Sequence, residues 1–409
     1  MRVALPETGA DWEMLAKRFD EMAAGDVDWR RGRAALYVFD PGEEVRSVAA
    51  RAYARFISEN GLGPLAFPSL ATMESQVVEM TLDLLQAPEG GAGCMTGGGS
   101  ESILMAVKAC REWWRAQGRD TTDAEILVPV SAHPAFNKAA VLLGLKVVRV
   151  PVGSDWRADA AALDAAVTDR TVMIVASAPC FPYGVIDPVA EVAAVADKRG
   201  LWLHVDACVG GYLAPFVRMN GADLPAFGFE VPAVRSMSAD LHKYGWAAKG
   251  ASCVLYRNDE LFQHQILSVE GWPLGRMTTP TAAGTRPGGA IAAAWSVMNH
   301  LGVAGYRDKA AQVVAVRERI EAGIAEIADL RPLTDVHLGI TTIVSDEVDI
   351  LAVGEAMRAK GWISAWLATP PAIHLMLSPG HAAAVDDYLA DLAACVAEAP
   401  TGGGKAFYG

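Results

Sequence analysis

Short apolar runs alternate with helical segments between residues 125 and 256, and this alternation constrains the fold more than any other feature of the chain. The expected strands cover 125–130, 146–152, 172–178, 201–206, 235–238 and 251–256. The expected helices between them cover 134–143, 159–166 and 189–198. Apolar strands separated by helices pair mainly in parallel, so this part of the chain predicts an α/β domain with a mainly parallel sheet.

Four polar residues fall at or just beyond the ends of these runs: His133, Ser177, Asp206 and Lys243. Ligands of open α/β sheets bind at the C-terminal ends of the strands. The pattern therefore predicts that these four side chains lie on one rim of the sheet.

Three regions follow from the changes of pattern along the chain. Residues 1–60 are expected to form a helical and extended segment, 61–288 a large α/β domain, and 289–409 a small C-terminal α+β domain. The elements expected in the last region are helices 290–301, 306–330, 350–360 and 382–397 and strands 339–345 and 373–377. The glycine-rich tail from Thr401 to Gly409 is expected to be mobile unless it is bound.

Composition and charge exclude several classes of function. With 409 residues and 52% hydrophobic content the chain can form a large core, and its net charge of -13 argues against a nucleic-acid partner. The first twenty residues carry four acidic side chains and no continuous apolar run, so we expect no signal peptide and no membrane span. The six cysteines form no C-x-x-C pair and the histidines show no metal spacing, which predicts a cytoplasmic protein without disulfides or bound metal.

A glycine-rich stretch, Thr96-Gly-Gly-Gly-Ser100, precedes a helical pattern. Glycines allow a sharp turn in which successive N–H groups converge, and the helix N-terminus adds its dipole. We therefore predict that Gly98, Gly99 and Ser100 bind a phosphate group. The alternative is a plain glycine turn with a serine at the helix N-cap, which has the same sequence pattern. The stretch matches neither G-x-G-x-x-G nor the lysine-containing P-loop, so neither a dinucleotide nor ATP is expected.

Asp206 and Lys243 together indicate pyridoxal-phosphate (PLP) chemistry. A lysine in the compact, aromatic setting of His242, Tyr244 and Trp246 can form a Schiff base with the cofactor aldehyde, and burial should lower its pKa. A carboxylate at a strand end can keep the pyridine nitrogen protonated, so that the ring accepts electrons. An exposed lysine and a structural aspartate remain the alternative explanation.

Other residues nearby have supporting roles in this prediction. His133 could stack on the pyridine ring, and His242 could bind the cofactor phosphate or shuttle protons. His204 precedes Asp206 by two residues, so strand alternation places both on one face. Arg286, beside glycines, could hold an anion. Packing or solvent exposure remains the alternative explanation for these residues.

Five sequence blocks resemble the PLP-dependent group II decarboxylase superfamily and, within it, the sphingosine-1-phosphate lyase family. They are Thr96-Gly-Gly-Gly-Ser-Glu-Ser, Ala132-His-Pro-Ala-Phe-Asn-Lys, Ser177-Ala-Pro-Cys-Phe-Pro-Tyr-Gly, His204-Val-Asp-Ala-Cys-Val-Gly-Gly and Ser238-Ala-Asp-Leu-His-Lys-Tyr-Gly-Trp-Ala-Ala-Lys-Gly. The resemblance covers about Tyr37 to Tyr306, and the final block favours the lyases over amino-acid decarboxylases. The chain departs from the lyase pattern at Gly63, where a histidine is usual, and at Asn137, where an aspartate is usual.

This resemblance implies the fold-type-I, aspartate-aminotransferase-like architecture and a homodimer with shared active sites. It implies that Lys243 carries the cofactor, that Asp206 faces the pyridine nitrogen and that His133 stacks on the ring. The cofactor set is Gly98, Gly99, Ser100, His133, Ser177, His204, Asp206, Ser238, His242, Lys243 and Thr285. Tyr37, Lys249 and Arg286 are implied at the substrate, Tyr37 also in catalysis, and Thr285 and Arg286 at the neighbouring subunit's site.

Three functions are compatible with these residues. The first is a carbon–carbon lyase that splits a phosphorylated, sphingoid-type amino alcohol into an aldehyde and phosphoethanolamine. The second is an L-amino-acid decarboxylase that uses the same cofactor. The third is a non-catalytic α/β binding protein, which would require neither Lys243 nor Asp206. Lys249 and Tyr37 favour a substrate phosphate, and Gly63 does not.

Overall fold

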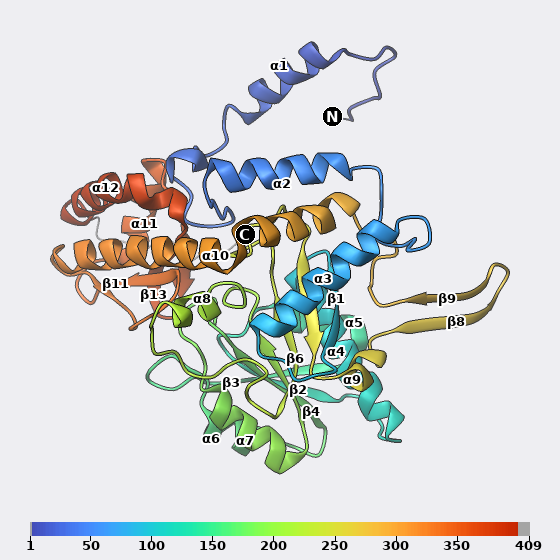
Figure 1. Cartoon of the computed structure of the whole chain (residues 1–409). Coiled ribbons are helices and arrows are strands. Elements are labelled where there is room, and N and C mark those ends of the chain that lie inside the picture. The colour runs from blue at the N-terminus through green and yellow to red at the C-terminus, as the bar shows by residue number, and fades with distance from the viewer. Residues whose placement is uncertain (1, 400–409) are drawn as a thin grey trace.

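The computed structural model describes residues 2–399, so the expectation for the tail at 401–409 lies outside the described residues. A seven-stranded sheet has the order β1-β7-β6-β5-β4-β2-β3 (Figure 1). Its strands are β1 (Ala92–Thr96), β2 (Glu125–Pro129), β3 (Lys146–Val150), β4 (Thr171–Ser177), β5 (Trp202–Asp206), β6 (Val234–Ala239) and β7 (Ser252–Tyr256). Only β7 runs antiparallel to its neighbours, which confirms the predicted mainly parallel sheet.

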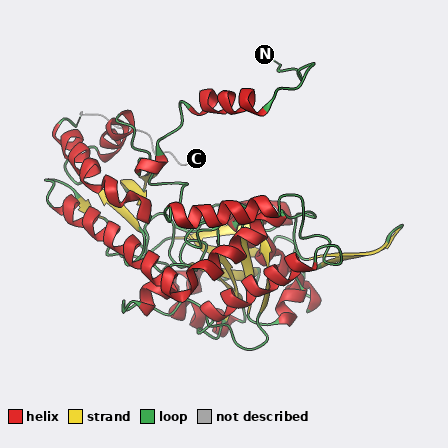
Figure 2. Ribbon diagram, turned by 45° about the horizontal axis from the view of Figure 1, so that its top comes forward, coloured by secondary structure: helices red, strands yellow, loops and turns green. Residues whose placement is uncertain are grey.

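Helices enclose this sheet, as Figure 2 shows. They are α3 (Pro68–Leu84), α4 (Gly99–Ala116), α5 (Ala135–Leu143), α6 (Ala160–Ala166), α7 (Val189–Arg199), α8 (Ala214–Met219) and α9 (Asp259–Gln263). The strands β2, β4 and β5 are buried along their whole length. Strands covered on both faces carry continuous apolar runs, which explains why the sequence pattern identified them.

A smaller antiparallel sheet lies toward the C-terminus, with the order β10-β11-β13-β12. Its strands are β10 (Arg331–Pro332), β11 (Ile340–Val344), β12 (Ala365–Ala368) and β13 (Pro371–Met376). The helices α11 (Ile350–Ala359) and α12 (Val385–Ala397) pack beside it, and the 3₁₀ helix η2 (Pro379–Ala384) precedes α12. The long helix α10 (Gly288–Ala325) contacts α3 and α8 beside the large sheet and β10 and β11 of the small sheet. It contains a break at Gly302, where φ is 51°, between the two helices expected from the sequence.

Two elements extend away from the rest of the chain in Figure 1. Helix α1 (Trp12–Ala23) has no buried residue, and it is followed by the 3₁₀ helix η1 (Trp29–Arg31) and by α2 (Glu43–Arg55). The hairpin β8 (Leu267–Trp272) and β9 (Gly275–Thr279) is exposed at every position except Thr279. A two-stranded hairpin is only marginally stable alone in water, and among the described residues this one gains little from burial.

The structure differs from the sequence expectations in several elements. Strand β1, which ends at the first residue of the glycine-rich stretch, was not expected, nor were the β8–β9 hairpin and β12. Within the segment 1–60 that was expected to be helical and extended, the extended part is limited to isolated bridges, such as that between Ala34 and Ile363. Within residues 2–399 no helix is long and apolar enough to cross a bilayer.

Candidate functional site

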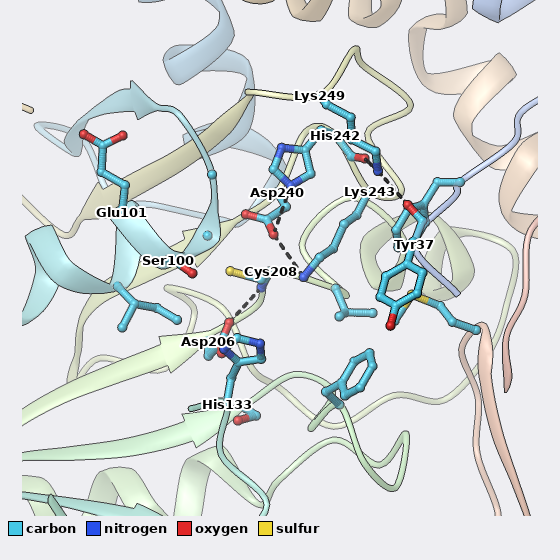
Figure 3. Close-up of a pocket in the computed structure, with 18 of the residues that line it drawn as sticks. Tyr37, Ser100, Glu101, His133, Asp206, Cys208, Asp240, His242, Lys243 and Lys249 are labelled. Carbon is cyan, nitrogen blue, oxygen red and sulfur yellow. Dashed lines mark hydrogen bonds and ion pairs between the residues drawn. The ribbon is translucent and has the colours of Figure 1, made fainter. Parts of the chain in front are cut away.

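A cavity of about 630 Å³ lies at the C-terminal ends of β4, β5 and β6 (Figure 3). Ser177 and Asp206 are the last residues of their strands, and Lys243 follows the end of β6 by a short turn. The expected residues that line the cavity are Tyr37, Gly98, Gly99, Ser100, His133, Ser177, Asp206, His242, Lys243 and Lys249. The rim arrangement predicted from the strand ends therefore occurs in the structure.

Lys243 is held by a tight, well-anchored turn. The neighbouring Tyr244 is fully buried and donates a hydrogen bond of 2.7 Å to the carbonyl oxygen of Leu377 in the small-sheet region. A Cβ at Gly245 would lie 2.6 Å from the backbone of Leu241, so only glycine fits there. The lysine amine is thereby fixed at the cavity wall.

Asp240 is a neighbour of Lys243 that the sequence analysis did not single out. Its carboxylate is buried and lies 3.0 Å from Lys243 Nζ and 3.7 Å from His242 Nε2. Burial lowers the pKa of Lys243, but the charge of Asp240, with a smaller contribution from Asp206, outweighs it and raises that pKa overall. The expectation of a lowered pKa was therefore wrong, because it did not include this carboxylate.

Asp206 faces the cavity with one oxygen tied to the protein. Its Oδ1 accepts hydrogen bonds from the backbone N–H of Cys208 at 3.1 Å and from the hydroxyl of Ser238 at 3.2 Å. His133 lies beside it in Figure 3. The Nδ1 of His133 accepts from the N–H of Ala135 at 3.1 Å, and burial lowers the pKa of the ring, so His133 is a neutral ring at this wall.

The glycine loop forms the part of the cavity wall between β1 and α4. A Cβ on Gly99 would lie 2.7 Å from Cys208 Sγ and 2.8 Å from Asp240 Oδ2, so a side chain is excluded there. The first N–H groups of a helix have no partner within the helix, and α4 begins at this point. Glu101 fixes the loop, because its carboxylate accepts from Gly97 N at 2.7 Å.

Tyr37 and Lys249 form another part of the wall, on the right of Figure 3. Tyr37 has a φ of 64°, a left-handed conformation that is uncommon for an aromatic residue. Lys249 Nζ donates to the carbonyl oxygens of Tyr37 at 3.0 Å and His242 at 3.2 Å. Burial, followed by the charge of Lys243, lowers the pKa of Lys249 to about 8.

Four expected residues lie outside this cavity. His204 and Ser238 are fully buried behind Asp206, and Thr285 is exposed on the loop after β9. Arg286 is buried in an ion pair with Glu74 and also donates to the carbonyl oxygen of Gly61 at 3.0 Å. Its guanidinium thus balances a buried carboxylate within the same chain and does not line the cavity.

The sequence analysis missed several residues that line the cavity: Leu36, Phe39, Glu101, Phe181, Cys208, Asp240 and Met376. Asp240 had a usable signal, since a carboxylate three residues before the lysine can reach it across one turn. Phe181 and Met376 come from loops and from the small sheet, which no local pattern connects to this site.

The residues at this cavity fit PLP. The cavity offers a group for each part of the cofactor. Lys243 fits the aldehyde, and Asp206, at the end of its strand, fits the pyridine nitrogen. The neutral ring of His133 fits the pyridine ring, and the helix N-terminus at Gly99, where no side chain fits, suits the phosphate. The buried Asp240 Oδ1 has no hydrogen-bond partner among residues 2–399, which leaves acceptor capacity at the same wall. All six cysteines are buried and free, and no group of three or more potential metal ligands occurs in the described part of the chain.

Comparison with known proteins gives a consistent result. The family model described as the pyridoxal-dependent decarboxylase conserved domain matches residues 1–343. Sphingosine-1-phosphate lyase of Oryza sativa subsp. japonica is 38% identical over 400 residues, covering 96% of this chain and 74% of the relative. A probable L-tyrosine/L-aspartate decarboxylase of Methanothermobacter thermautotrophicus is 33% identical, covering 81% of this chain and 89% of the relative.

Solved structures resemble the whole chain. Sphingosine-1-phosphate lyase of Burkholderia pseudomallei K96243 superposes with a TM-score of 0.92 at 34% identity, covering 98% of this chain and 93% of that one. Glutamate decarboxylase of Lactobacillus brevis has a TM-score of 0.86 at 18% identity, covering 98% and 96%. The second likeness shows a shared fold alone.

Proposed function

The chain belongs to the pyridoxal-dependent decarboxylase family and to its sphingosine-1-phosphate lyase group, and from this we propose that it cleaves a phosphorylated, sphingoid-type amino alcohol. It is a PLP-dependent lyase of fold type I. The proposed products are an aldehyde and phosphoethanolamine, and sphingolipid metabolism is the proposed context of the reaction. The observation that carries the substrate proposal is a lysine, Lys249, on the cavity wall beside Tyr37.

Each cavity residue has a proposed role toward the cofactor. Lys243 would hold PLP covalently, Asp206 would face its ring nitrogen, and His133 would pack on the ring. The phosphate would be bound by Gly98, Gly99, Ser100 and His242, with Ser177 at the same wall. When bound, PLP withdraws electrons from the bond that breaks.

The remaining residues would bind the substrate and move its protons. Lys249, which carries its charge below about pH 8, would bind the substrate phosphate, and Tyr37 would orient the reacting hydroxyl group. A base removes the proton of the 3-hydroxyl group, the Cα–Cβ bond breaks, and the aldehyde leaves. The carbon that remains takes one proton. Lys243 Nζ, protonated beside Asp240, is the proposed donor of that proton.

We also propose a cytoplasmic homodimer with shared active sites. The support for a partner copy is the unburied helix α1 and the exposed β8–β9 hairpin, which bears Trp272 and Leu274. Thr285, exposed after this hairpin, is the residue proposed to act toward the partner's site, whereas Arg286 is held within its own chain by Glu74. The six unpaired cysteines favour a reducing compartment. Sedimentation of the purified protein tests the dimer, and a monomer at micromolar concentration would contradict it.

Absorbance of the bound cofactor tests the enzyme proposal. The purified protein should show a visible band that Lys243→Ala lacks. Sphingosine-1-phosphate and phosphoethanolamine should shift this band, and sphingosine-1-phosphate should yield aldehyde. Release of carbon dioxide from an amino acid would instead favour a decarboxylase, the activity named for the archaeal relative. A colourless protein that PLP cannot reconstitute would contradict both activities.

A further inference from the structure

A row of buried polar side chains lies behind Asp206. Strand alternation places Trp202, His204 and Asp206 on one face of β5, and Ser236 and Ser238 on the same face of β6. The two strands run in parallel with His204 opposite Ser236 and Asp206 opposite Ser238. Four of these side chains are fully buried, and Asp206 is 7% exposed. Since burying unpaired polar groups is costly, their hydrogen bonds must be accounted for.

These side chains form one continuous hydrogen-bonded chain. Trp202 Nε1 lies 2.8 Å from Ser236 Oγ, and Ser236 Oγ lies 2.8 Å from His204 Nδ1. His204 Nε2 lies 3.3 Å from Ser238 Oγ, which is 3.2 Å from Asp206 Oδ1. The chain therefore joins an indole to the carboxylate at the cavity without a break.

Its direction follows from the two ends. An indole N–H can only donate, so Ser236 Oγ accepts from Trp202 and its own proton is free to go to His204 Nδ1. At the other end the carboxylate can only accept, so Ser238 donates to Asp206 and accepts from His204 Nε2. The carboxylate end therefore requires a proton on His204 Nε2, and in a neutral ring Nδ1 then accepts the proton of Ser236. Burial lowers the pKa of His204 to about 4, which agrees with a neutral ring.

We propose that Trp202, Ser236 and His204 are positioning residues that fix the hydrogen bond donated by Ser238 to Asp206 Oδ1, and so orient this carboxylate toward the cofactor. In this arrangement every proton of the chain points toward Asp206. The carboxylate keeps its rotamer because Ser238 and the N–H of Cys208 both hold the same oxygen. This inference rests on the proposed role of Asp206 at the ring nitrogen. A purely structural polar core would instead affect stability alone.

Trp114 offers a matched control for the test. It is 2% exposed, its indole N–H donates at 2.9 Å to the carbonyl oxygen of Val172, and like Trp202 it packs edge-on against Trp113. Trp202→Phe and Trp114→Phe each remove one buried indole hydrogen bond. Only Trp202→Phe interrupts the chain that ends at Asp206.

The first measurement is nitrogen NMR of His204 in apo protein labelled at histidine, with His204→Asn used for assignment. The wild type and Trp114→Phe should show the Nε2–H tautomer at neutral pH. In Trp202→Phe the Ser236 hydroxyl loses the donor that orients it, so part of the protein should shift to the Nδ1–H tautomer, in which Ser238 donates to His204 Nε2 instead of to Asp206. A wild-type Nδ1–H tautomer would overturn the proposal, whether or not the enzyme binds PLP.

The second measurement is the dissociation constant of PLP, followed by fluorescence quenching or absorbance. Trp202→Phe should bind PLP about tenfold more weakly than Trp114→Phe, the scale expected for misdirecting one hydrogen bond to a charged group. Ser236→Ala, a smaller change, should show the same loss and serves if Trp202→Phe does not fold. Equal PLP affinity in all these variants would overturn the proposal, whereas absence of PLP binding in the wild type would contradict the proposed function itself.

Discussion

Lys249 gives the sharpest test of the proposed substrate. Its ammonium group has a pKa lowered to about 8, because the side chain is partly buried and Lys243 lies nearby. A substrate phosphate that depends on this charge should therefore bind more weakly as the pH rises above about 8. Lys249→Arg keeps a positive charge at every accessible pH and is the natural comparison.

The size of the effect follows from the protonated fraction. With a pKa of about 8, roughly nine tenths of Lys249 is charged at pH 7 and roughly one tenth at pH 9. The predicted loss of affinity is about tenfold, which corresponds to about 1.4 kcal/mol. The second pKa of a phosphate monoester is about 6, so the ligand stays a dianion across this range and contributes little to the change.

Phosphoethanolamine, the proposed product, is the suitable ligand, and the shift in cofactor absorbance reports its binding. The dissociation constant should rise about tenfold from pH 7 to pH 9 in the wild type. The ionisation of the phosphoethanolamine amine changes its binding equally in both proteins and is subtracted. After this correction, the dissociation constant of Lys249→Arg should be nearly constant from pH 7 to pH 9. An identical pH dependence in both proteins would refute the assignment of Lys249 to the phosphate.

Three further predictions concern the cofactor wall and the core. In Asp240→Asn the pKa of Lys243 should fall, because burial then acts without the opposing carboxylate. PLP should therefore attach to the apo protein faster at neutral pH, as followed by stopped-flow absorbance. Slower attachment would contradict the proposed effect of the ion pair. Gly99→Ala should weaken PLP binding at least about tenfold, since the new methyl would lie 2.7 Å from Cys208 Sγ; unchanged affinity in a titration would show that the loop yields. Phe136→Ala removes a fully buried ring and should lower the unfolding free energy, measured by urea denaturation, by about 3–5 kcal/mol. A loss below about 1 kcal/mol would mean that the surrounding core closes over the space left by the ring.

The sequence predicted the main sheet well because its strands are buried on both faces. Strands such as β4 and β5 carry unbroken apolar runs, and their ends located Ser177 and Asp206 at the cavity. Strand β1 was missed because Gly91, Gly93 and Gly97, in and beside it, are typical of a loop. The β8–β9 hairpin was missed for the opposite reason, since its exposed, mixed residues have no core face to produce an alternating pattern.

Only the site residues that stand in a recognisable local sequence pattern could be predicted. Lys243 and Asp206 were identified by their setting and spacing, but the pKa of Lys243 depends on Asp240, whose burial is a tertiary property. The direction of the chain from Trp202 to Asp206 likewise depends on pairing between β5 and β6. Strand alternation placed His204 on the face of Asp206, yet only the register brings in Ser236 and Ser238.

The charges at the cavity also bear on the homodimer. Among the lining residues that the structure describes, Lys243 and Lys249 are the cations, and Lys243 is already paired with Asp240. A substrate phosphate carries about -1.5 to -2 at pH 7, more than the single charge of Lys249 can balance. Arg286 of the same chain is held by Glu74 and does not line the cavity. A second cation delivered by a partner copy would close this gap, so the charge balance and the uncovered hairpin support the same proposal of a shared active site.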